Sequence, residues 1–321
     1  MRKIAILLML IFVTLIVGCG KSKKESEGEK TESQQKRLEI VTTTGMIADI
    51  VKNIGDDFVD VTALMGPGVD PHLYKASEDD IKRMTNADVI FYNGLHLEGA
   101  MAELLERMSG SVRTLAVSSK IDTSLLIRSE QFEGSFDPHI WFDVRLWMSA
   151  VQYVRDILME MDPDHSEVYY FNTEGYSIDL SDLHDYVYKT ARSIPPPQRV
   201  LITAHNAFSY FGRAYGFEVR GLQGISTATE EGTADVQNLA QFIAERKIAA
   251  IFAETSVPSR SIEAVKAAAV AKGFDVKIGE TLYSDAMGSI GTPVGTYVGM
   301  IRYNIDTMAD ALMGGRSPQM P

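Results

Sequence analysis

The fold prediction starts from residues 164–193, which read DHSEVYYFNTEGYSIDLSDLHDYVYKTARS. Gly175 is the only strong helix breaker in this stretch, and the prolines at 195–197 stop any helix that precedes them. We therefore predict one long helix over 164–194. A single helix of that length can join two separate bodies, so we expect it to link lobes of residues 38–163 and 195–321.

Strand and helix patterns alternate on both sides of this helix. That alternation predicts an α/β fold in which each lobe is a mostly parallel sheet flanked by helices. A polar, irregular stretch at 118–137 interrupts the first lobe. The predicted strands cover 38–43, 58–65, 88–92, 112–117, 199–203, 217–222, 249–253 and 276–282. The predicted helices cover 46–54, 77–86, 99–108, 144–161, 206–215, 233–246, 258–272 and 295–312.

Composition limits the class of protein. The chain has 321 residues, of which 45% are hydrophobic, so it can build a sizeable core. Its formal net charge is −12, which argues against binding nucleic acid, because that requires clustered Lys and Arg. We expect a monomer.

The N-terminus has the layout of a secretory signal peptide at 1–18. Arg2 and Lys3 precede an apolar run at 4–17, which is shorter than the roughly 20 residues of a membrane-spanning helix. Gly18 and then Cys19 follow this run. Because Cys19 is the only cysteine, the chain can form no internal disulfide. Residues 20–37 are polar and charged, which favours a flexible segment. Together with Cys19 they form the predicted tether, residues 19–37.

The sequence LIVGC at 15–19 resembles the lipobox of bacterial lipoproteins. The resemblance implies that Cys19 becomes the lipid-carrying first residue of the mature chain, with palmitate among its acyl groups. The protein would then be anchored to the extracytoplasmic face of the cell membrane, on the periplasmic side or at the cell surface.

Three of the six histidines and one aspartate follow predicted strands or end the irregular stretch: His72, His139, His205 and Asp285. Ligands of open α/β sheets bind at such exits. The tripeptide Asp-Pro-His occurs twice, at 70–72 and 137–139, and its proline restricts the backbone before the histidine. The other three histidines, His96, His165 and His184, lack this context, and we predict the last two to be solvated.

Three neutral imidazoles with one carboxylate would suit zinc and would also accept manganese. Such a site should lose affinity as the pH falls through about 6.5, where free histidine becomes protonated. Asp70 and Asp137 could each accept a hydrogen bond that orients the nearby imidazole. Trp141 is expected to pack behind the site, and Glu254 is a loop carboxylate that could lie beside it.

Four motifs resemble the TroA/ZnuA-like substrate-binding proteins of zinc and manganese ABC transporters: GPGVDPHLY at 66–74, DPHIWFD at 137–143, HNAFSYFGRAYG at 205–216 and YSDAMG at 283–288. Residues 291–305 resemble the closing segment of that family, and the match runs over about 38–313. The resemblance implies that His72, His139, His205 and Asp285 bind one divalent metal ion. It also implies two lobes, and delivery of the metal to a membrane permease and its ATPase.

Two departures leave the metal open between zinc and manganese. Residues 118–137 lack the His-rich loop that zinc-specific members often carry, and His205 stands where manganese members often have glutamate. Two other functions remain as alternatives, a metal-dependent hydrolase on a similar scaffold and a surface adhesin lipoprotein. The sequence has no HExxH, G-x-S-x-G, phosphate-binding or dinucleotide motif, so we expect no enzyme.

Overall fold

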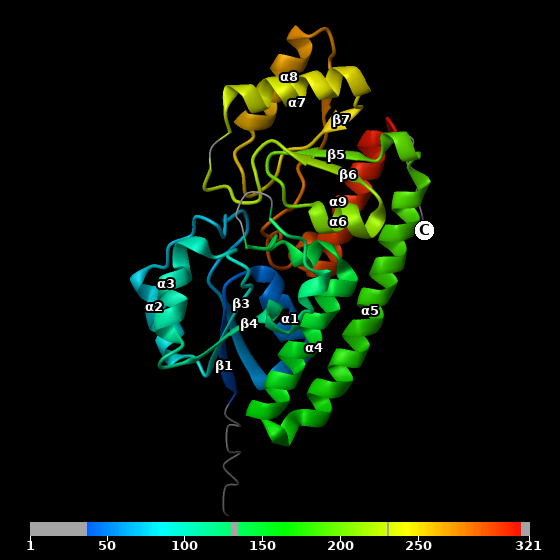
Figure 1. Ribbon diagram of the computed structural model, residues 1–321. Helices are drawn as coiled ribbons and strands as arrows, with labels where there is room; N and C mark the ends of the chain where they lie inside the picture. The colour runs from blue at the N-terminus through cyan, green and yellow to red at the C-terminus, as the bar shows by residue number, and fades with distance from the viewer. Residues whose placement is uncertain (1–36, 130–133, 230, 316–321) are drawn as a thin grey trace, which may run out of the picture. The chain divides into compact units, whose positions relative to one another are not determined.

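The computed structural model describes residues 37–129, 134–229 and 231–315 (Figure 1). The signal peptide, Cys19 and nearly all of the tether lie outside these ranges. The long helix is confirmed as α5, Ser166–Ser193, which a 3-10 turn at Pro163–His165 joins to α4, Val144–Met161. Figure 1 shows α4 and α5 side by side.

The first sheet is parallel, as predicted, with strand order β2-β1-β3-β4. Its strands are β1 Leu38–Thr42, β2 Val59–Ala63, β3 Val89–Tyr92 and β4 Arg113–Ala116. Alternate residues of a strand face opposite sides, so Ile40 packs into one core and Val41 into another. Helix α1, Gly45–Gly55, contributes to the first core, and α2, Glu78–Asn86, with α3, Ala102–Met108, contributes to the second. Both faces of this sheet are therefore covered.

The second half has shorter strands than predicted. β5, Val200–Thr203, pairs in parallel with β6, Glu218–Gly221, and β7, Ala250–Ile251, pairs with β8, Lys277–Ile278. The two pairs meet where the Phe252 amide donates to the Ile202 carbonyl at 2.9 Å. Regular pairing of β7 and β8 ends before residues 253 and 282, where the predicted strands end. Beyond it, the two segments pair only through one isolated parallel bridge, between Glu254 and Leu282.

The helices of the second half are α6 Ser209–Tyr215, α7 Thr233–Arg246, α8 Arg260–Ala271 and α9 Tyr297–Leu312. Helix α6 was predicted to begin at Asn206. It begins later because the Asn206 amide donates to the Gly224 carbonyl at 3.0 Å and the His205 amide donates to a carboxylate oxygen of Glu254 at 2.8 Å. The loop after β5 is thus fixed in a non-helical conformation.

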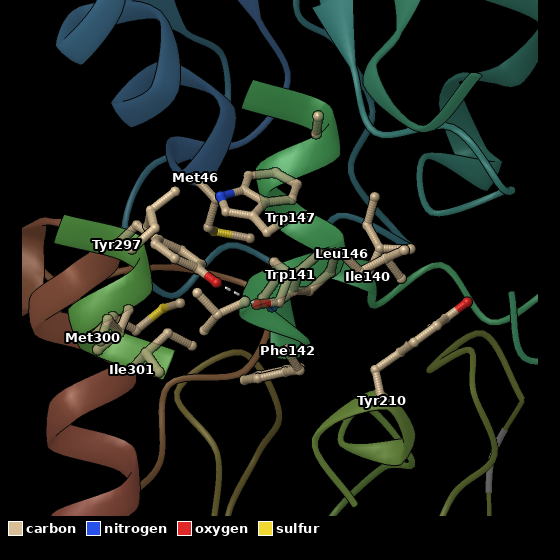
Figure 2. Close-up of a cluster of buried hydrophobic side chains, with 14 of the residues drawn as sticks. Met46, Ile140, Trp141, Phe142, Leu146, Trp147, Tyr210, Tyr297, Met300 and Ile301 are labelled. Carbon is tan, nitrogen blue, oxygen red and sulfur yellow. Dashed lines mark hydrogen bonds between the residues drawn. The ribbon is translucent and has the colours of Figure 1, made fainter. Parts of the chain in front are cut away.

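The largest hydrophobic core runs through both halves of the chain. Helix α5 packs on α1 and α4 from the first half and on α6 and α9 from the second. Figure 2 shows the aromatic centre of this core, where the Tyr297 hydroxyl at the start of α9 donates to the Trp141 carbonyl at 2.7 Å. Within the described ranges, no helix has the length and apolar character needed to cross a bilayer.

Candidate metal centre

Four side chains from four loops meet at one buried point. His72 lies after β2, His139 before α4, His205 two residues after the end of β5, and Asp285 after the bridge at Leu282. One ligand atom from each residue can be chosen so that all four lie within 4.8 Å of one another, and all four residues are buried. Strand exits of the two halves therefore converge, although the residues are far apart in sequence.

The carboxylate of Asp285 lies at the centre of this group. Its Oδ1 is 3.5 Å from His139 Nε2, and its Oδ2 is 3.2 Å from His205 Nε2 and 4.0 Å from His72 Nε2. Two donors of a tetrahedral zinc ion lie about 3.3 Å apart, given zinc–ligand distances near 2.0–2.1 Å. The separations from His139 and His205 are close to that value, and the separation from His72 is longer.

The inward-facing atoms of this group lack hydrogen-bond partners. In the part of the chain that the structure describes, none is found for His72 Nε2, His139 Nε2, His205 Nε2 or Asp285 Oδ1. Buried polar atoms are normally satisfied, since leaving them unpaired costs free energy. Three imidazole nitrogens and a carboxylate oxygen aimed at one point fit a divalent transition metal.

The second Asp-Pro-His tripeptide fixes the orientation of His139. Asp137 Oδ1 accepts hydrogen bonds from the His139 amide at 2.9 Å and from its Nδ1 at 2.7 Å. A proton held on Nδ1 leaves the Nε2 lone pair facing the centre. Asn93 and Tyr210 hold the same loop by donating to the carbonyls of Pro138 and Asp137, at 3.0 and 2.9 Å.

Glu254 holds His205 in a similar way. One carboxylate oxygen accepts from the His205 amide at 2.8 Å, and the other lies 2.7 Å from His205 Nδ1. Burial lowers the pKa of His205, but the carboxylates of Glu254 and Asp285 outweigh it and raise that pKa well above its ordinary value. Without metal, the His205 imidazole therefore holds a proton more strongly than an ordinary histidine does.

His72 has a different environment. Burial is the main reason that its pKa falls to about 3, and the nearby His139 and His205 add to the effect against the attraction of Asp285. Its imidazole is therefore neutral at physiological pH. Asp70 Oδ1 accepts from the His72 amide at 2.9 Å and so fixes the loop, not the ring. For Asp285, burial raises the pKa, but the surrounding imidazoles, His205 first, lower it below its usual range.

Trp141 joins two of the loops. Its ring lies 5.2 Å from that of His139, and its Nε1 donates to the Ser284 carbonyl at 3.0 Å, next to Asp285. Figure 2 shows Trp141 within the aromatic cluster that includes Phe142 and Tyr297. The hydrophobic core thus supports the centre from behind.

The remaining histidines lie away from this point. His96 is exposed. His165 is half-buried against the Phe58 ring, 4.0 Å away, with its Nδ1 2.6 Å from Asp162. His184 is buried, and its Nδ1 lies 3.2 Å from the Tyr215 hydroxyl. The prediction that these two histidines are solvated was wrong, because His165 stacks on Phe58 and His184 faces α6 from the packed side of α5.

Sequence reasoning missed the residues that support the loops from a distance. Buried Glu98 accepts from Thr43 Oγ1 and the Asn93 amide, both at 2.7 Å, and so links the ends of β1 and β3. Asn93-Gly94 directly after a buried strand was a signal that could have been noticed. Neither Glu98 nor Thr227, which bonds Asp70, stands in a recognisable pattern.

The fold and the site together define a class of protein: two α/β lobes linked by a long helix, with a buried three-histidine, one-aspartate group where strand exits of both halves meet. The family model described as zinc-uptake complex component A, periplasmic (ZnuA), matches residues 40–311. The chain belongs to this family.

Named relatives agree with this assignment. The chain is 49% identical over 285 residues to the zinc-binding protein TroA of Treponema pallidum, covering 89% of this chain and 92% of the relative. It is 45% identical to the manganese-binding lipoprotein MntA of Bacillus subtilis, covering 94% and 97%. The solved structure of periplasmic zinc-binding TroA from Treponema pallidum matches with a TM-score of 0.84 and 50% identity, covering 86% of this chain and 99% of that one. The predicted fold class and family are confirmed.

Proposed function

We propose that this protein is an extracytoplasmic substrate-binding lipoprotein that captures one zinc or manganese ion and delivers it to the permease of an ABC importer. The observation that supports this most is the buried group of inward-facing donors without hydrogen-bond partners. The chain matches nearly the whole length of relatives that are named as zinc-binding or manganese-binding. The metal is cargo here, because the protein must both hold it and release it.

In this proposal His72, His139, His205 and Asp285 bind the ion, two from each half of the chain. Asp285 supplies the negative charge that offsets part of the charge of the ion. Asp137 and Glu254 orient the imidazoles that they contact, Asp70 fixes the His72 loop, and Trp141 supports the loops of His139 and Asp285.

Zinc should bind more tightly than manganese in vitro, following the general order of divalent affinities. Asp285 provides a hard oxygen donor, which keeps manganese acceptable beside three imidazoles. Manganese uptake in cells would then depend on metal availability. One relative is named for zinc and another for manganese, which is consistent with such a mixed donor set.

The cellular part of the proposal rests on the N-terminal sequence. Signal peptide 1–18 is removed, Cys19 receives palmitate and other acyl chains, and residues 19–37 tether the protein to the outer side of the cell membrane. The partners are a permease and its ATPase, and the protein acts as a monomer. We also propose the lobe bounds 38–163 and 195–321, with 164–194 as the linking helix.

Elemental analysis of the protein purified with its native metal tests the function. We expect about one zinc or manganese ion per chain, and no hydrolysis of ester, phosphate or peptide substrates. Metal-dependent turnover would favour the hydrolase alternative. A folded protein that neither retains nor takes up zinc or manganese would overturn the proposal and leave the adhesin alternative. Neither the matched family nor the relatives named above are described as hydrolases or adhesins.

Zinc affinity should fall by about tenfold for each unit of decreasing pH between about pH 8 and 6. The metal competes with the proton on His205. In the metal-free protein burial lowers the pKa of His205, but the charges of Glu254 and Asp285 outweigh this effect and raise that pKa well above 6.5. The loss therefore begins at higher pH than for an ordinary histidine. His72, with a pKa near 3, adds no competing proton in this range.

Competition titration with a chelating dye measures this dependence, with proton uptake by the dye corrected for. The Glu254→Gln variant is the matched comparison, since loss of that charge should lower the pKa of His205 and flatten the dependence near pH 8. An affinity that stays constant from about pH 8 to 6 in the unaltered protein would contradict the expected proton release.

A further inference from the structure

The loop that carries His72 is more exposed than the loop that carries His139. It follows β2, which is an edge strand of the first sheet. Gly66, Pro67 and Gly68 are exposed, and the Leu73 side chain is 52% exposed. The His139 loop, in contrast, is held by buried hydrogen bonds from Asn93 and Tyr210. If the metal leaves by movement of one loop, the His72 loop can move with less disruption of buried contacts.

A loop of the second half, residues 223–229, reaches the His72 loop. It follows β6, next to the exit of β5 that carries His205. Ile225 and Ser226 from this loop line the same cavity as His72, a space of about 290 Å³. The hydroxyl of Thr227 donates to Asp70 Oδ2 at 2.6 Å, across the boundary between the two halves.

Asp70 connects this contact to the metal centre. Its Oδ2 accepts from Thr227, while its Oδ1 accepts from the His72 amide at 2.9 Å. One half-buried carboxylate therefore links the second half to the backbone of His72. A hydrogen bond to a charged group is stronger than one between neutral groups, so this link resists separation of the two loops.

We infer that Thr227 and Asp70 form a latch that holds the His72 loop over the bound metal and thereby sets how fast the metal is released. The inference rests on the proposed function, since it assumes that His72 binds the ion. Thr227 is a positioning residue: it acts on His72 through Asp70. Opening of the latch frees the His72 loop while Asp285, His139 and His205 remain held by their own loop contacts.

The test measures zinc release from the full chain after mixing with excess chelator. Thr227→Val keeps the size and shape of the side chain but removes the donor. We expect zinc to dissociate about tenfold faster, which is about 1.4 kcal/mol. Thr229→Val is the matched control, because Thr229 is an exposed threonine of the same loop whose hydroxyl donates to the Ser226 carbonyl at 3.2 Å. Its release rate should equal that of the unaltered protein.

Two further readouts distinguish a latch from general loss of structure. Thr227→Ser retains the donor and should restore slow release. The visible spectrum of the cobalt-loaded protein and the thermal stability of the metal-free protein should be the same in Thr227→Val and Thr229→Val. Asp70→Asn should also speed release, and adding Thr227→Val to it should have little further effect, because both changes break the same contact.

Equal release rates for Thr227→Val and Thr229→Val would overturn the latch, as would failure of Thr227→Ser to restore slow release. Failure of the unaltered protein to bind zinc would instead refute the proposed function. The two failures are therefore distinguishable in one set of measurements.

Discussion

Replacing His205 with alanine should weaken zinc binding by more than about a hundredfold. Losing a residue that only orients a metal ligand reduces affinity by at most about a hundredfold, and loss of a ligand should cost more. His205 Nε2 faces Asp285 Oδ2 at 3.2 Å and has no other partner in the described ranges, so its loss removes one of the four proposed donors. Competition titration with a chelating dye gives the affinity. His72→Ala should have a similar effect.

The controls must separate ligand loss from unfolding. His205→Ala leaves the buried carboxylates of Glu254 and Asp285 without the imidazole between them, which destabilises the fold, so circular dichroism should accompany each titration. His96→Asn is the matched control, because His96 is exposed and has a φ of 65°, a conformation that asparagine tolerates. His184 is unsuitable as a control since it is buried. If His96→Asn weakens binding as much as His205→Ala, or if His205→Ala binds normally, the four-ligand proposal fails.

Replacing Cys19 with alanine should move the protein from the membrane to the soluble extracytoplasmic fraction. Cys19 is the only cysteine and follows the apolar segment of the proposed signal peptide, so no other thiol can carry the lipid. Detergent phase partitioning and metabolic labelling with palmitate measure the change.

Ser22→Ala, in the same tether, is the control and should behave like the unaltered protein. An unaltered protein that carries no acyl chain, or one that partitions into the aqueous phase, would show that the lipoprotein proposal is wrong. Zinc affinity of Cys19→Ala should be unchanged, because residues 38–313 contain every proposed ligand.

Local patterns were sufficient for most elements of the fold. Helix α4 occupies 144–161 and α7 occupies 233–246, as predicted, because apolar spacing and chain breakers act over a few residues. Helix α2 begins with a capping box formed by Ser77 and Asp80, which is also an interaction over a few residues. The short pairing of β7 and β8 was not predictable, since strand pairing depends on residues distant in sequence.

The sequence by itself determined the α/β class, the long linking helix and the four candidate ligands, because strand exits, Asp-Pro-His tripeptides and family motifs are local features. Only the tertiary structure decided which side chains of other loops make contacts that support them. Glu254 with His205, Trp141 with Ser284 and Thr227 with Asp70 are contacts between separate loops. The burial of His184 was likewise decided by the packing of α6 on α5. Contacts of this kind leave no local sequence pattern, since their distances are set by how the sheets and helices pack.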